Sequence, residues 1–289
     1  MALVIAGSFM LASKGIFAKF LYAQGLDFET VVAVRALLAI PGFLILAAVL
    51  GGLGSLREST WSDRGQAALA GLVCYYFGAA VNFYALTLID ASVERALLFS
   101  YPALVVMAGW FMSGRPPGPV VLVAVLATYV GIALTVGAFN RELLQQNLTG
   151  GLLVLICSAT ISFYFIISGK LTRSMGSASF TVVAMTAAGL ALAVHYQFRQ
   201  GWQHLALDTD NWILMIALVV FATVLPLYLV AEGVRLIGAQ RAAIASTVGP
   251  PATAMMAVIL LNETIRIGQL AGIALIVGGI ILLELRQSR

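Results

Sequence analysis

Long uninterrupted apolar runs are the feature that most constrains how this chain can fold. Runs of about 18 residues or more predict helices that cross a lipid bilayer. They do not alternate between polar and apolar residues, as barrel strands of about ten residues do. The sequence therefore predicts an all-α integral membrane protein with ten transmembrane helices. These lie at about 2–22, 29–50, 66–88, 92–112, 120–138, 151–171, 178–198, 211–232, 240–261 and 267–285.

Composition agrees with this class of protein. Hydrophobic residues make up 61% of the 289 residues and charged residues only 10%, whereas a soluble domain carries about 25% charged residues. Ten spans of about 20 residues each leave only short connections, so no soluble catalytic domain is expected. The first run does not resemble a signal peptide, because Lys14 and Lys19 lie within or after the run rather than before it.

The distribution of basic residues predicts the orientation, because cytoplasmic loops carry an excess of Lys and Arg. With a cytoplasmic N-terminus, nine basic residues fall inside and three outside, so we expect both termini in the cytoplasm. The net charge of +4 reflects this bias and gives no reason to expect a nucleic-acid partner. The inner set is Arg57, Arg64, Arg115, Lys170, Arg173, Arg235, Arg241, Arg286 and Arg289, and the outer set is Arg141, Arg199 and Arg266.

The chain also repeats itself. Shifted by 148 residues, the segment around Pro102 aligns without a gap with the segment around Pro250. Shifted by 151 residues, "TVVA" at 30–33 meets "TVVA" at 181–184. The predicted units are five-helix repeats at 1–140 and 150–289. An odd number of helices makes the second unit inverted, and inverted repeats are typical of transporters that work by alternating access around a central cavity.

Three motifs resemble a known family: "ASVERALLFSYPALVV" (91–106), "VRLIGAQRAAIASTVGPPATAMMAVILLNETI" (234–265) and "GIALIVGGIIL" (272–282). Together with the five-plus-five plan, they resemble the EamA-type members of the drug/metabolite transporter (DMT) superfamily, and are most similar to the YddG-type amino-acid exporters. Glu263 resembles the acidic residue that ends the ninth helix in this family, whereas Arg115 departs from the acid expected in the first half. The resemblance implies a transporter of the bacterial inner membrane.

Transporter sites lie near the bilayer midplane, and polar or aromatic residues near the middle of a span are the candidates for the cavity wall. Lys14 is about twelve residues into the first run, where a charge is costly to insert. The alternative is that Lys14 snorkels and that the aromatic stripes only pack between helices. The predicted cavity set is Lys14, Tyr75, Tyr76, Asn82, Tyr101, Ser162 and Tyr164.

Two further pairs are singled out. Glu94 and Arg95 are expected in the first turn of the fourth span, either as a charged outer rim or at the mouth of the cavity. Pro102 and Pro250 are expected to kink equivalent helices near the midplane, although membrane helices also tolerate proline. Arg35 is expected nearer the outer surface, where it would snorkel.

The expected function is export of small metabolites, with large neutral and aromatic amino acids as the substrate class. The alternatives are a nucleotide-sugar or phosphate-ester exchanger on the same scaffold, which needs several cavity cations, and an intramembrane enzyme, which needs clustered acids or histidines.

No P-loop or metal motif is present, so neither ATP nor any cofactor or metal is expected. No Asp or Glu falls near the middle of a run, which predicts weak or absent proton coupling. The expected partners are a small-molecule substrate and the lipid bilayer, around a monomer.

Overall fold

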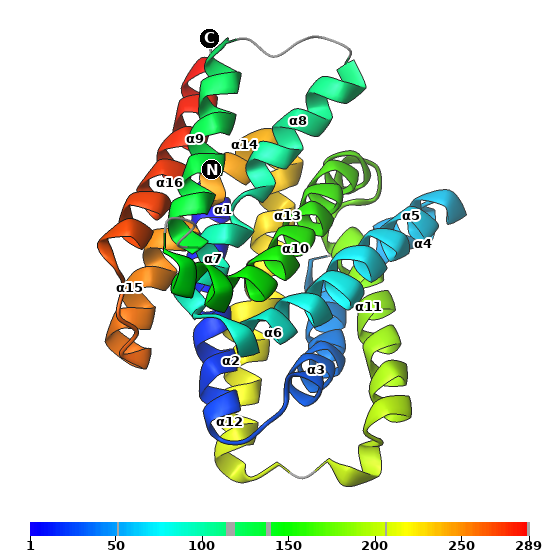
Figure 1. Ribbon diagram of the computed structural model, residues 1–289. Coiled ribbons are helices and arrows are strands. Elements are labelled where there is room, and N and C mark those ends of the chain that lie inside the picture. Colours follow the sequence, from blue (N-terminus) through cyan, green and yellow to red (C-terminus); the bar gives the residue numbers. More distant parts are fainter. Residues whose placement is uncertain (51, 114–118, 137–139, 206, 288–289) are drawn as a thin grey trace.

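The computed structural model describes residues 1–50, 52–113, 119–136, 140–205 and 207–287 (Figure 1). Every regular element within these ranges is helical, which confirms the predicted all-α class for this part of the chain. The elements are α1 (Ala2–Ala12), α2 (Lys14–Ala23), α3 (Phe28–Val49), α4 (Gly52–Glu58), α5 (Trp61–Gly71), η1 (Leu72–Gly78), α6 (Ala79–Leu88), α7 (Ala91–Leu98), α8 (Tyr101–Ser113), α9 (Pro119–Val136), α10 (Arg141–Met175), α11 (Ser177–Arg199), η2 (Trp202–His204), α12 (Thr209–Val219), η3 (Val220–Val224), α13 (Leu225–Ile237), α14 (Ala239–Ala245), η4 (Ser246–Val248), α15 (Gly249–Leu261) and α16 (Ile267–Gln287).

Helical structure coincides with each of the ten predicted runs, but the described residues contain seven segments that are long and apolar enough to cross a membrane. The 3₁₀ turn η4 divides the ninth run, so neither of its parts reaches that length. The count of ten spans therefore stays a prediction. Arg115 and Arg289, which entered the orientation argument, lie outside the described residues. The seven segments are Ala2–Ala23, Phe28–Val49, Trp61–Leu88, Ala91–Phe111, Arg141–Met175, Ser177–Arg199 and Thr209–Ile237.

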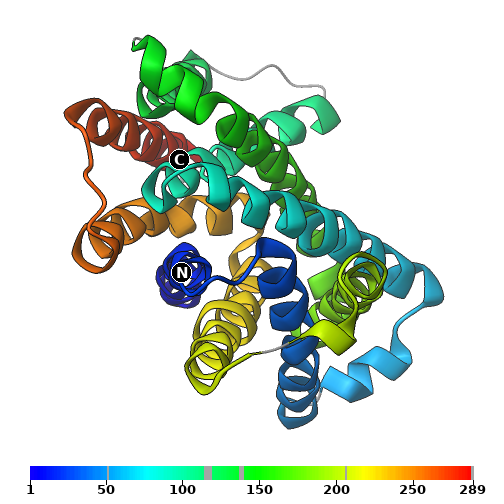
Figure 2. The same cartoon turned by 60° about the horizontal axis from the view of Figure 1, so that its bottom comes forward.

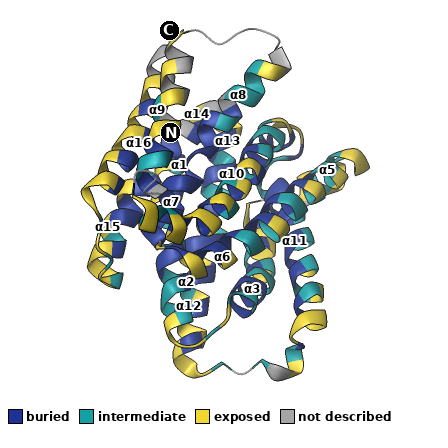
Figure 3. Ribbon diagram, viewed as in Figure 1, coloured by how far each residue is buried: buried dark blue, intermediate teal, exposed yellow. Residues whose placement is uncertain are grey.

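Many large apolar side chains are exposed, and Figure 3 shows exposed positions along most of the helices. Phe198 is 87% exposed and Ile259 is 66% exposed, for example. Contiguous apolar surface of this extent is unusual on a soluble monomer and marks contact with a membrane or a partner. Together with the apolar helices, it identifies the chain as a membrane protein.

Several helices begin where a short polar side chain caps them. Asp27 Oδ1 accepts the backbone N–H of Thr30 at 2.8 Å at the start of α3. Asn140 Oδ1 accepts the N–H groups of Glu142 and Leu143 at the start of α10. Such caps satisfy backbone donors that have no partner within the helix. These polar residues therefore fix the ends of the apolar rods.

Helices from the two halves of the chain interleave, and their contacts come in matched pairs. Helix α1 of the first half packs against α13 of the second half. In the matching pair, α10 of the second half packs against α6 of the first half. Helix α3 packs against α11, and α9 lies beside α16 (Figure 1). In Figure 2, the dark blue helix α1, marked N, lies beside the yellow and orange segments of the second half. Exchanging the halves thus leaves the pattern of contacts largely unchanged.

Irregular helix geometry also recurs at the repeat spacing. The π-helical segments η1 and η3 begin at Leu72 and Val220, which are 148 residues apart. The fourth predicted span is interrupted between α7 and α8, at residues 99–100, and the ninth is interrupted by η4, at residues 246–248. The two halves therefore share their departures from α-helix, and π segments are frequent at functional sites.

Candidate functional site

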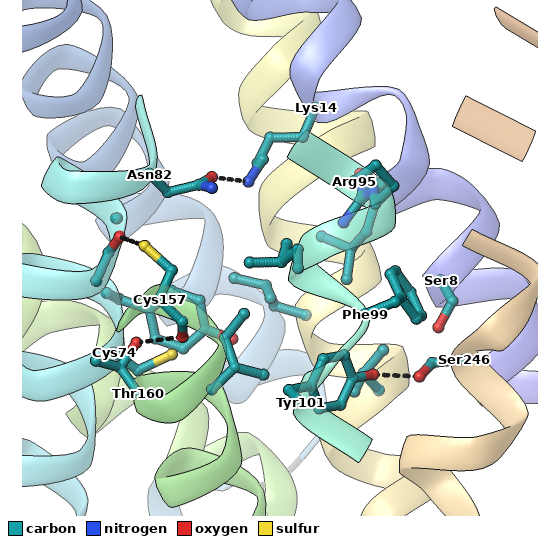
Figure 4. A pocket seen from close by; sticks show the side chains of 18 of the residues that line it. Ser8, Lys14, Cys74, Asn82, Arg95, Phe99, Tyr101, Cys157, Thr160 and Ser246 are labelled. Carbon is teal, nitrogen blue, oxygen red and sulfur yellow. Dashed lines mark hydrogen bonds between the residues drawn. The ribbon is translucent and has the colours of Figure 1, made fainter. Parts of the chain in front are cut away.

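The interior holds a cavity of about 110 Å³, several times the space that one water molecule needs (Figure 4). Its wall comes from α1, α2, α3, η1, α6, α7 and α8 of the first half and from α10, η3, α13 and η4 of the second. Both π segments and both helix interruptions therefore border the same space. Much of the wall is aromatic or aliphatic, for example Phe83, Phe99 and Leu227.

A charged cluster lies at one side of this cavity. Lys14 Nζ donates a hydrogen bond to Asn82 Oδ1 and lies 3.5 Å from Glu94 Oε1. Asn82 Nδ2 donates to the same carboxylate oxygen at 2.6 Å. Glu94 is 1% exposed, and a carboxylate so deeply buried is stable only with such partners. Lys14 is therefore a neutralised cation of the cavity wall.

The first predicted span is interrupted at Ser13, between α1 and α2, and Arg95 donates hydrogen bonds beside this interruption. Its Nη2 donates to the carbonyl oxygen of Leu11, and its Nε donates to Thr253 Oγ1 at 3.2 Å. Thr253 Oγ1 in turn donates to the carbonyl oxygen of Ala12 at 2.9 Å. A guanidinium at the C-terminal end of a helix matches the negative end of the helix dipole. Arg95 thus stabilises the break at Ser13.

Arg35 of α3 also lines the cavity, at 5% exposure. Its Nη1 lies 3.4 Å from Thr223 Oγ1, and its Cζ lies 4.9 Å from the centre of the Phe83 ring. Thr223 belongs to the π segment η3 and donates to the carbonyl of Leu218 at 3.0 Å. The π segment of the second half therefore presents a hydroxyl to a guanidinium of the first half.

Aromatic residues form the wall near the interruption between α7 and α8. Tyr101, the first residue of α8, shares a hydrogen bond with Ser246 Oγ of η4. Its ring centre lies 5.0 Å from that of Phe165. Tyr75, in η1, packs edge-on against Tyr164 with ring centres 5.0 Å apart. The equivalent breaks in the two halves are thus joined through one tyrosine hydroxyl.

The predicted cavity set is only partly brought together. Lys14, Tyr75, Asn82 and Tyr101 line the cavity. Tyr76 does not, because adjacent residues of a helix point about 100° apart, and its hydroxyl lies 3.1 Å from His195 Nδ1. Ser162 and Tyr164 are buried in α10 and, like Tyr76, are not among the residues that line this cavity, so a role for these three in binding stays a prediction.

The outer-rim prediction for Glu94 and Arg95 is corrected. Both residues are buried, at 1% and 5% exposure, because α7 enters the interior between α15, α10 and α9. Glu94 is therefore buried among the helices although it does not fall near the middle of an apolar run. Pro102 and Pro250 lie in the first turn of α8 and of α15, directly after the two interruptions, where proline fits without losing a helical hydrogen bond.

Several cavity residues were not foreseen. Cys74, Cys157, Thr160 and Ser246 line the cavity, and their small side chains carry little sequence signal. Arg35 had a usable signal, because a charge within an apolar run marks a functional site by default. Among the described residues, no three His, Cys, Asp or Glu side chains gather in a way that could hold a metal ion.

Glu263, the acidic residue of the second-half motif, has a structural role. Its carboxylate accepts the backbone N–H groups of Ala91 at 2.9 Å and Ser92 at 3.2 Å, and the Ser92 hydroxyl at 2.7 Å. It therefore caps the N-terminus of α7 from the other half of the chain, where an acidic group is favoured.

Known proteins agree with this architecture. A solved crystal structure, described only as that of a protein, matches with a TM-score of 0.74 over 100% of this chain and 99% of its own, at 18% identity, which shows the shared fold. "Uncharacterized transporter YcbK" of Bacillus subtilis (strain 168) is 31% identical over 276 residues, 93% of this chain and 87% of that protein. "Uncharacterized inner membrane transporter YicL" of Salmonella typhimurium is 27% identical over 202 residues, 69% of this chain and 66% of that protein.

The family comparison covers both halves of the chain. The model of the EamA-like transporter family matches residues 1–137 and again residues 148–285. The two matches together span nearly the whole sequence. The chain therefore belongs to the EamA-like transporter family and is a membrane transporter.

Proposed function

We propose that this chain is a secondary transporter that exports small amphipathic metabolites, with large neutral and aromatic amino acids as the substrate class. The observation that carries the proposal is the cavity between the two halves, whose wall combines apolar and aromatic surface with a few polar groups. Ligand sites for solutes that are part apolar and part charged have this composition. The proposed export direction and the amino-acid class rest on the resemblance to YddG-type exporters.

The proposed mechanism is alternating access by two inverted five-helix repeats, at 1–140 and 150–289. Three observations support it: the family matches each half separately, the helix contacts come in matched pairs, and the π segments recur at the same spacing. Two similar halves around one site can exchange conformations and so open the site to either face. The interruptions that border the cavity would absorb the change in helix direction.

A second candidate is a carrier of anionic metabolites such as nucleotide sugars. The observation that favours it is that three cations, Lys14, Arg35 and Arg95, border the cavity. Two of the three already have two partners each in the protein, Lys14 with Glu94 and Asn82, and Arg95 with Leu11 and Thr253. A diphosphate would need several donors at once, so this candidate ranks second.

The proposed setting is the bacterial inner membrane, with both termini cytoplasmic and with the protein acting as a monomer without ATP or nucleic acid. We also propose weak or absent proton coupling. Glu94 is buried, but the protein already holds its carboxylate in an ion pair with Lys14. Substrate flux that stops when only the pH gradient is collapsed would contradict this part.

The direct test is uptake by purified protein in liposomes. Vesicles preloaded with unlabelled solute are offered the labelled form of a panel of amino acids and nucleotide sugars. The proposal expects counterflow of aromatic and large neutral amino acids and little flux of nucleotide sugars. Flux of nucleotide sugars alone would replace the first candidate by the second. Protein-free liposomes and liposomes with heat-denatured protein are the controls.

A further inference from the structure

Arg35 differs from the other two cations of the cavity in how little of its hydrogen-bonding capacity the protein uses. Among the described residues its one hydrogen bond is the 3.4 Å contact from Nη1 to Thr223 Oγ1, which is longer than the usual range of about 2.7–3.2 Å. Its buried Nε has no partner among the described residues. It takes part in none of the ion pairs found in the described part of the chain.

The comparison with its neighbours sharpens this difference. The Lys14 ammonium has the Glu94 carboxylate at 3.5 Å and the Asn82 amide oxygen. The Arg95 guanidinium donates to a helix-terminal carbonyl and to a threonine hydroxyl. Arg35 has an aromatic face, that of Phe83, in place of an acid. A cation over an aromatic ring is stabilised much less than a buried cation paired with a carboxylate.

A buried guanidinium without a counter-ion is costly, and proteins rarely keep one without a use for it. Arginine presents five N–H donors in a planar fork that matches a carboxylate through two parallel hydrogen bonds. Because Arg35 lines the cavity and is 5% exposed, a ligand in the cavity is the partner that could complete this fork. We infer that Arg35, oriented by Thr223 and Phe83, binds the carboxylate of the transported solute.

This inference rests on the proposed transport function and narrows its substrate class. A single free guanidinium suits one carboxylate, and the wall beside it is apolar, with Phe83, Leu227 and Ala222. The solute is therefore a monocarboxylate with an apolar body. An amino acid with an aromatic side chain fits this description, and so does the acid that lacks its amino group.

The experiment uses four probes that share one ring: L-phenylalanine, 3-phenylpropanoate, 3-phenylpropanamide and 2-phenylethylamine. Binding to the purified full-length transporter is measured by thermal stabilisation and by competition in the liposome assay. The carboxylate-bearing probes are expected to bind the unmodified protein, and the amide and the amine are expected to bind at least about 10-fold more weakly, because charge-assisted hydrogen bonds are lost.

Three substitutions test the residue itself. Arg35→Gln should weaken binding of 3-phenylpropanoate about 10-fold or more, because it removes the fork and its charge. Arg35→Lys should retain part of the affinity, and Thr223→Val should cause a smaller loss through misorientation of the fork. Arg199→Gln is the matched control, because Arg199 is exposed and pairs with Glu29 at 3.3 Å outside the cavity. It should bind all probes as the unmodified protein does.

The outcomes separate this inference from the proposed function. Transport of L-phenylalanine with unchanged affinity in a folded Arg35→Gln protein overturns the inference and leaves the function standing. Arg35-dependent binding of 3-phenylpropanoate without flux of any amino acid supports the inference and overturns the amino-acid proposal. Equal binding of acid and amide by the unmodified protein, or binding of no carboxylate, also overturns the inference. These two outcomes need no variant, so they can be measured even if Arg35→Gln fails to fold.

Discussion

Lys14 Nζ lies 3.5 Å from Glu94 Oε1, and this ion pair joins the first residue of α2 to the first turns of α7. Asn82 of α6 contacts both partners. Three segments of the first half therefore meet at one buried pair beside the cavity. The Glu94 carboxylate is thus buried among the helices, whereas the hydropathy pattern alone suggests a position at the end of a helix.

Breaking this pair from one side should destabilise the protein more than removing both charges. A buried charge that loses its partner costs up to about 3–5 kcal/mol, whereas an apolar replacement of the whole pair is often neutral. We expect Glu94→Gln and Lys14→Met each to lower the unfolding temperature in detergent, and the double substitution to recover part of the loss. A double-mutant cycle with purely additive effects would contradict the coupling.

The cap that Glu263 provides should be measurable as stability. Glu263→Ala removes the acceptor of two backbone N–H groups and one hydroxyl at the start of α7, and loss of a helix cap costs about 0.5–2 kcal/mol. Thermal unfolding should therefore occur at a lower temperature. Glu263→Gln, which keeps an acceptor oxygen, should lose less. An unchanged unfolding temperature for the alanine variant would show that water replaces the cap.

The contact between α9 and α16 depends on two facing glycines, Gly131 and Gly272. A Cβ atom on Gly272 would lie 2.6 Å from the carbonyl oxygen of Gly131, which backbone cannot accommodate without moving. A Cβ on Gly268, in the same helix, would meet nothing within 4 Å. We therefore expect Gly272→Ala to reduce the yield of folded protein and Gly268→Ala to leave it unchanged. Equal yields in fluorescence-detected size-exclusion chromatography would contradict the close approach.

Two tyrosines of the predicted cavity set, Tyr101 and Tyr76, should behave differently. Tyr101→Phe removes the hydroxyl that bonds Ser246 in the equivalent interruption of the other half, so transport should fall several-fold while the protein remains folded. Tyr76→Phe removes a contact with His195 away from the cavity, so transport should be close to normal. Initial rates of counterflow distinguish them, and a larger effect at Tyr76 would place the transport path elsewhere.

The sequence was informative about the helices and much less so about which side chains reach the cavity. Apolar runs long enough to cross a bilayer predict where the helices lie along the chain, and helical structure coincides with each of the ten runs. The repeat spacing placed Pro102 and Pro250 at equivalent points, and the interruptions do lie directly before both. Apolar runs and repeat spacings can be seen in the sequence without knowing how the helices pack.

The cavity depends on geometry that local sequence does not encode. Tyr75 and Tyr76 are neighbours in η1, and which of the two reaches the cavity depends on how this segment is turned toward the other helices. Glu94 and Arg95 are buried because α15 and α10 cover α7, which requires knowledge of how distant helices pack. The position of Arg35 within its apolar run suggests a place nearer the outer surface. In the structure Arg35 lines the cavity and lies beside the Phe83 ring.

The central claim is that the cavity is the transport site and opens in turn to each side of the membrane. The chain has two cysteines, Cys74 and Cys157, and both line the cavity. In a Cys74→Ala variant, Cys157 is therefore the single thiol that a small anionic methanethiosulfonate, added to right-side-out or inside-out vesicles, can modify. The account predicts modification from both sides, slowed by a transported solute. Modification from one side only, or at a rate that the solute leaves unchanged, would contradict it.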